Sequence, residues 1–110
     1  MATLSVQNIV LAGLEPTYAN ATELGDEFVN TTGRVFLHVK NGDASEKTVT
    51  VLSQKTCDQG ETHNIAVTIP ASEERIIGPL TTGRFNDGDG KVQVTYSAVT
   101  SVTVAAIQIP

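Results

Sequence analysis

The sequence predicts an all-β protein: a single β-sandwich or small barrel of about seven to eight mostly antiparallel strands, with little or no helix. About a third of the 110 residues are β-branched, with 13 Val, 7 Ile and 15 Thr. Such side chains lose rotamer freedom in helices but pack well in sheets. Short alternating runs recur between turn signals, and no long stretch has the helical period of about 3.6 residues. The length is that of one domain, residues 1–110.

The N-terminal quarter carries the least regular pattern. Residues 3–11 (TLSVQNIVL) predict a strand whose phase slips near Asn8. We therefore expect residues 1–12 to form an N-terminal arm or an edge strand. Residues 13–25 predict a loop with a short helical turn or strand inside it, and residues 26–31 predict a short strand.

The middle of the chain predicts four strands. Residues 34–40 (RVFLHVK) alternate cleanly, with Val35, Leu37 and Val39 on one face. A turn signal at Asn41-Gly-Asp follows, so this strand and the next predict a hairpin. The other three strands are predicted at residues 47–53, 63–69 and 73–78.

The last thirty residues predict a loop and two strands. Residues 81–90 are rich in turn residues and predict a loop, from which Phe85 is expected to point into the core. Residues 91–98 (KVQVTYSA) alternate as a half-buried strand does. The run 101–109 changes phase at Ala105-Ala106. This change predicts either a β-bulge or a strand that is covered on both faces.

The charge distribution excludes two classes of partner. The net charge is −5, from 12 acidic and 7 basic residues. Neutralising the phosphates of a nucleic acid requires clustered Lys and Arg, and here the cations are scattered singly. We therefore expect no nucleic-acid partner and no adhesion to an anionic membrane.

Cys57 is the only cysteine, so the chain can form no intrachain disulfide. The absence of an intrachain disulfide is typical of a protein made in a reducing compartment such as the cytoplasm. The first residues lack the positive and apolar regions of a signal peptide, so none is expected.

Catalysis has a single candidate pair, which the sequence supports weakly. Cys57 and His63 are six residues apart across a turn and could act as nucleophile and base. No orienting third group or oxyanion hole stands at a recognisable spacing. We therefore expect no enzyme activity, no catalytic residues and no cofactor.

The segment Asp87-Gly-Asp89-Gly is similar to the start of a calcium loop. A full EF-hand needs an oxygen ligand where Lys91 stands and a Glu where Ala98 stands, so that motif fails. Two interpretations remain open. Asn86, Asp87 and Asp89 form an irregular Ca²⁺ site, or they form a hairpin turn in which the Asp side chains cap local amides.

One aromatic residue is a candidate interface anchor. Phe36 lies on the polar side of its strand, opposite Val35 and Leu37, between Arg34 and His38. An exposed Phe in such a position is typical of residues that anchor a protein–protein contact.

Several stretches resemble the small all-β virion proteins of tailed bacteriophages that are called head-decoration or capsid auxiliary proteins. The matching stretches are residues 14–18 (LEPTY), 25–30 (GDEFVN), 33–42 (GRVFLHVKNG), 54–60 around Cys57, 77–79 (IGP), 84–87 (RFND) and 92–97 (VQVTYS), which run into the final Val-rich strand. Together they extend over most of the chain.

This resemblance implies a structural virion protein, made in the host cytoplasm, that binds the assembled capsid surface. It would stabilise the shell by bridging copies of the major capsid protein, as a homotrimer. The alternative is a binding module of a neck, tail or fibre that recognises another virion protein or the host surface. We expect residues 2–11 to act as an arm that adds a strand to a neighbour. The interface candidates are Leu4, Val6, Tyr18, Phe36 and His38.

Overall fold

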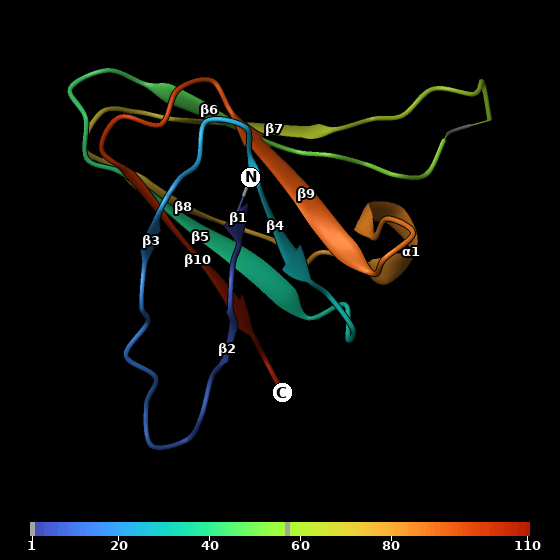
Figure 1. The fold of residues 1–110 in the computed structure, drawn as a ribbon, viewed down its shortest axis with the longest axis horizontal. Helices are drawn as coiled ribbons and strands as arrows, with labels where there is room; N and C mark the ends of the chain where they lie inside the picture. Colours follow the sequence, from blue (N-terminus) through green and yellow to red (C-terminus); the bar gives the residue numbers. More distant parts are fainter. Residues whose placement is uncertain (1, 57) are drawn as a thin grey trace.

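The alternating strands assemble into two five-stranded sheets that share one apolar core (Figure 1). This computed structural model describes residues 2–56 and 58–110. The first sheet has the order β1-β4-β9-β6-β7. Its strands are β1 (Ala2–Thr3), β4 (Asp26–Val29), β9 (Lys91–Tyr96), β6 (Lys47–Val51) and β7 (Ile65–Ile69).

The second sheet has the order β2-β10-β5-β8, and β3 also pairs with β10. Its strands are β2 (Val6–Asn8), β10 (Val102–Gln108), β5 (Val35–Asn41), β8 (Glu74–Ile77) and β3 (Ala19–Asn20). The predicted all-β sandwich is confirmed, whereas the barrel alternative is wrong because the two sheets remain separate. Two parallel pairings, β1 with β4 and β2 with β10, make both sheets mixed.

The core lies between the sheets because each long strand turns one face inward. In β5 the residues alternate strictly between buried and half-buried, and β6 repeats that pattern. Val35, Leu37 and Val39 are completely buried, as predicted. Phe85 is also buried, on a one-turn helix α1 (Thr82–Phe85) within the predicted loop.

The N-terminal segment differs from its prediction. Instead of one strand over residues 3–11, the chain pairs first with β4 through β1 and then with β10 through β2. Leu4 stands at the crossing between the sheets, where its side chain enters the core and its amide donates to the Glu27 carbonyl at 2.7 Å. The predicted arm therefore adds its strands to this chain's own sheets.

Strand β10 is covered on both faces and has no bulge against β5. Its register with β5 runs without interruption from Val102 opposite Asn41 to Gln108 opposite Val35. Ala105 and Ala106 are both buried, although they point to opposite faces. The sequence left a β-bulge and a doubly covered strand as alternatives at Ala105-Ala106, and the doubly covered strand is the one present.

Two segments project from the sandwich (Figure 1). One is the loop that joins β2 to β3, and the other is the long connection between β6 and β7. Among the described residues, no helix has the length and apolar character needed to cross a membrane.

Candidate interaction surface

Residues 2–22, which we call the N-terminal lobe, form two legs and a loop that projects beyond the sandwich (Figure 1). The first leg pairs with β4 of the first sheet and then with β10 of the second, and the other leg pairs with β10. The Gln7 side chain joins the legs by two hydrogen bonds to the backbone of Thr17, each 2.8 Å long. The chain reverses where the Gly13 amide donates to the Val10 carbonyl at 2.9 Å. Together these hydrogen bonds hold the loop in a defined position.

The end of the loop, residues 9–12, is apolar and exposed, and we call it the apolar tip. Ile9 and Val10 are 39% and 50% exposed, and Leu11 is fully exposed at 109%. The Ile9 amide donates to the Gln108 carbonyl, which brings the half-exposed Ile109 beside the tip. Large apolar side chains gathered in this way are typical of a surface that contacts another protein.

A groove of about 420 Å³ lies between the two legs of the lobe. Its floor is the middle of β10, and its walls come from both legs. Small side chains leave the space open: Ala106 stands between Leu37 of β5 and Val6 of β2, and Ala105 stands beside His38 of β5. Its apolar lining includes Leu4, Tyr18, Ala19, Val104, Ala105 and Ala106, and polar side chains such as Thr3 and Gln7 also line it.

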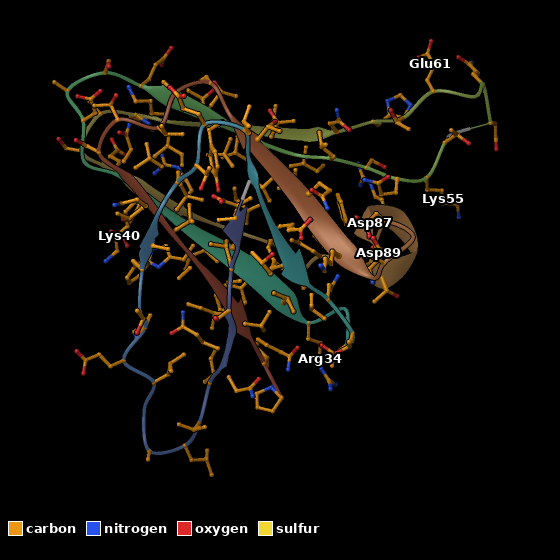
Figure 2. The ribbon with its side chains drawn as sticks, in the orientation of Figure 1. Arg34, Lys40, Lys55, Glu61, Asp87 and Asp89 are labelled. Carbon is orange, nitrogen blue, oxygen red and sulfur yellow. The ribbon has the colours of Figure 1, made fainter. Side chains whose placement is uncertain are left out.

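Four side chains from three segments form a polar cluster on the outer face of the second sheet, and one of them, Tyr18, also lines the groove. The Tyr18 hydroxyl lies 2.6 Å from His38 Nδ1, and His38 Nε2 lies 2.9 Å from Glu74 Oε1. With the imidazole proton on Nε2, His38 accepts from Tyr18 and donates to Glu74. Lys40 Nζ lies 4.0 Å from the centre of the Tyr18 ring, in a cation–π contact. Figure 2 shows Lys40 beside β3.

The five predicted interface residues fall into two groups. Tyr18, Phe36 and His38 lie on the outer face of the second sheet, and Tyr18 and His38 are in direct contact. Leu4 is instead buried, and Val6 packs against the core. Leu4 is a core residue because the segment that carries it crosses between the sheets. Phe36 is half-buried because its neighbour on β10 is Ile107.

The turn over residues 86–90 uses its polar side chains within the protein. Asp87 Oδ1 accepts from the amides of Asp89 and Lys91 at 2.9 and 3.0 Å, and its Oδ2 accepts from Gln93. The hydrogen bonds from the Lys91 and Asp89 amides, followed by that from Gln93, lower the pKa of Asp87. Asn86 exchanges hydrogen bonds with Asn30. This geometry supports the hairpin-turn interpretation.

The other chemical candidates lead to no assembled site. Within residues 2–56 and 58–110, no three His, Cys, Asp or Glu side chains gather as metal ligands would. Cys57 lies outside the described residues, and His63 is exposed within the β6–β7 connection. The His63 carbonyl accepts a hydrogen bond from Arg84 at 2.8 Å.

Sequence reasoning missed the apolar tip and the groove. Ile9, Val10 and Leu11 are good strand residues, so the sequence predicts a strand where the structure has the tip. One signal could have revealed it, since the next residues, Ala12 and Gly13, begin a turn directly after three consecutive apolar residues. The groove carries no signal of this kind, because it depends on which strands meet at β10.

The Tyr18–His38 contact predicts a measurable effect on the lobe. We expect Tyr18→Phe to lower the free energy of unfolding by about 0.5–1.5 kcal/mol, because it removes the hydroxyl that His38 accepts from. Amide hydrogen exchange in β3 should accelerate, since Tyr18 directly precedes that strand. Glu74→Gln keeps an acceptor for His38 Nε2 and should change the exchange less. Equal exchange in wild type and Tyr18→Phe would contradict this role for the hydroxyl.

Comparisons of the chain with protein-family models, with curated proteins and with solved structures found no match.

Proposed function

We propose that this protein is a structural virion component of a tailed bacteriophage, which binds the assembled capsid and stabilises it by bridging capsid subunits. The observation that carries the proposal is the composition of the N-terminal lobe. The chain has 12 acidic and 7 basic side chains, yet residues 2–22 include a single charged one, Glu15. The same residues hold the exposed apolar tip.

Depletion of charge together with exposed apolar side chains distinguishes the centre of a protein interface from ordinary surface. The lobe is also held in place before any partner binds, by the Gln7–Thr17 bonds and by β-pairing on both sides of the groove. A preorganised surface loses little conformational entropy on binding. These properties suit a protein whose task is attachment.

Binding of this kind stabilises a shell by mass action. A ligand that binds the assembled shell and not its free subunits raises the stability of the shell by RT ln(1 + [L]/Kd). A decoration protein present at about a hundred times its dissociation constant would add about 2.7 kcal/mol for each site. The resemblance of the sequence to head-decoration proteins is the reason for naming the capsid as the partner.

The proposal is tested with empty expanded capsids built from the major capsid protein of the same genome. Wild-type protein should sediment with these capsids and raise their temperature of disruption. Leu11→Asp should weaken binding by about 30-fold or more, because it places a charge where the proposed contact with the capsid would bury the Leu11 side chain. Leu24→Asp is the matched control, since Leu24 is 77% exposed but lies outside the lobe, and it should bind as wild type does.

Two results would overturn the proposal. One is wild-type protein that stays in the supernatant at every concentration tested. The other is Leu11→Asp binding as tightly as Leu24→Asp. Retention by isolated necks, tails or fibres instead of capsids would favour the alternative position in the virion.

A further inference from the structure

We infer that two copies of this chain pair along the free edge of β7, antiparallel to each other and around a twofold axis at Val67. The contact joins the first sheets of the two copies into one continuous sheet. It involves β7 alone, so it is independent of the partner that the N-terminal lobe binds.

β7 is an edge strand whose outward backbone groups have no partner. It ends the first sheet and pairs only with β6. The Thr48 carbonyl accepts from the Ser97 amide, so the even-numbered residues of β6 bond toward β9 and its odd-numbered residues toward β7. In this register the odd-numbered residues of β7 bond to β6. The amides and carbonyls of Ala66 and Thr68 therefore point to the free edge, and no described residue bonds to them.

The other free edges of the two sheets are short or protected. β1, β2 and β3 have only two or three residues each. On β8 the Arg75 guanidinium donates to the Glu74 carbonyl at 2.8 Å. Short strands, charged side chains, prolines and bulges are the means by which proteins prevent sheets from joining at their edges. β7 has five residues, contains no charge and no proline, and pairs with β6 without a bulge.

The free edge of β7 is complementary to itself. With a twofold axis at Val67, Ala66 of each copy lies opposite Thr68 of the other. These are the residues whose amides and carbonyls point outward, and each such pair exchanges two hydrogen bonds. Pairing in this register therefore satisfies all the outward groups of Ala66 and Thr68 in both copies.

The core is incompletely covered at β7. Ile65 and Val67 pack against the core but are half-buried, whereas Val51 and Val49 opposite them on β6 are completely buried. In the twofold pair, Val67 lies opposite the same residue of the second copy, and Ile65 lies opposite Ile69. The contact therefore buries aliphatic surface that the single chain leaves partly in water.

The charge of β7 favours a second copy as the partner. Identical strands around a twofold axis bring like charges near each other, which destabilises a strand pair. In this chain of net charge −5, residues 64–72 contain no charged side chain. Among the described strands of four or more residues, only β7 and the central β10 lack one. An acidic protein gains from charged residues when its partner is of opposite charge, so a neutral edge suits an identical copy.

The pairing leaves both N-terminal lobes free. β1, which belongs to the lobe, and β7 end the first sheet at opposite edges. The lobes of the pair therefore lie at the two ends of the joined sheet. Two lobes on one particle can bind two sites at once, which raises the apparent affinity. This consequence, unlike the pairing itself, rests on the proposed function.

The experiment measures the mass of the full chain by sedimentation equilibrium over a series of concentrations. Wild-type protein should form a dimer. The variant that combines Ala66→Lys with Thr68→Lys places like charges opposite each other in both pairs, so its dimer dissociation constant should rise by about 10-fold or more. Its matched control combines Ala66→Lys with Thr68→Glu, which places opposite charges in both pairs, and it should remain a dimer. Both positions are exposed, so both variants should fold, as a thermal unfolding scan will verify.

Thr68→Pro tests the backbone bonds without adding a charge. Proline removes the outward amide of Thr68, which takes no part in the ladder with β6, and edge strands tolerate it at such positions. The fold should therefore persist while the dimer dissociates.

The inference is wrong if wild type is monomeric at all concentrations, if it forms a trimer, or if the two charged variants associate equally. Failure here is distinguishable from failure of the proposed function. If wild type is monomeric but Leu11→Asp still loses capsid binding, only the inference falls. If the dimer forms as expected but no capsid binding occurs, only the proposed function falls.

Discussion

Gly25→Ala is expected to destabilise the protein by about 2–5 kcal/mol, a large share of the roughly 5–15 kcal/mol that holds a domain of this kind together. Gly25 is buried directly before β4, with a φ angle of +97°. Its amide donates to the Thr22 carbonyl at 2.8 Å, which closes the turn that enters the strand. The position combines two separate penalties for any side chain.

The first penalty is conformational and the second is steric. An L-residue at this positive φ costs about 1–2 kcal/mol relative to glycine. A β-carbon at position 25 would also lie 2.5 Å from the carbonyl oxygen of Val94 on β9. That atom belongs to the backbone of a central strand, so relief requires β4 and β9 to separate. Overpacking of this type costs about 1–3 kcal/mol more.

Gly13→Ala separates these two penalties. Gly13 has a φ angle of +96°, nearly identical to that of Gly25, but a β-carbon there would have no neighbour within 4 Å. Chemical denaturation should therefore give a loss of about 1–2 kcal/mol for Gly13→Ala and a clearly larger loss for Gly25→Ala. Equal losses would show that the contact with Val94 carries no energy.

The strands that face the core on one side were predictable from the sequence. In β5, β6 and β9 the apolar residues recur at every second position, with Phe36 as the one exception, so the period of two is visible. The change of phase at Ala105-Ala106 marked β10 as unusual, although the sequence left a β-bulge and a doubly covered strand as alternatives. These features are local, since they depend on burial of one strand and not on the identity of its neighbours.

The features that depend on strand order were not predictable. The N-terminal strand pairs with both sheets, and hydrophobic periodicity does not say where a chain crosses from one sheet to the other. Tyr18 and His38 are twenty positions apart, and they meet because β3 and β5 both pair with β10. The groove likewise exists because β3 and β2 occupy successive parts of the same β10 edge.

The second large effect is expected at the buried pair of Asp26 and Tyr96. Asp26 is completely buried, and its Oδ2 accepts from the Tyr96 hydroxyl at 2.7 Å and from the Thr22 amide at 3.3 Å. Among the described residues, Asp26 Oδ1 has no hydrogen-bond partner. Tyr96→Phe would leave a buried carboxylate with one weak donor, so we expect a loss of about 2–4 kcal/mol.

This pair also predicts how stability depends on alkaline pH. Burial raises the pKa of Tyr96 above its ordinary value of 10.0, and its hydrogen bond to Asp26 raises the pKa further. The folded protein therefore keeps the phenol proton at a pH where the unfolded chain releases it. The stabilising effect of this proton is complete below about pH 10 and decreases as the pH rises above that value, by up to about 1.4 kcal/mol per pH unit.

Denaturation curves of wild type and Tyr96→Phe between about pH 8 and about pH 11.5 test this expectation. The free energy of unfolding of wild type should fall more steeply above about pH 10, so the difference between the two proteins should shrink there. Lys91, whose pKa the hydrogen bond to Glu27 raises, is present in both proteins and cancels from the difference. Asp26→Asn should retain the steep fall, because burial is the larger cause of the raised pKa of Tyr96. Parallel curves for wild type and Tyr96→Phe would mean that the phenol ionises equally in the folded and unfolded chains, contrary to its burial.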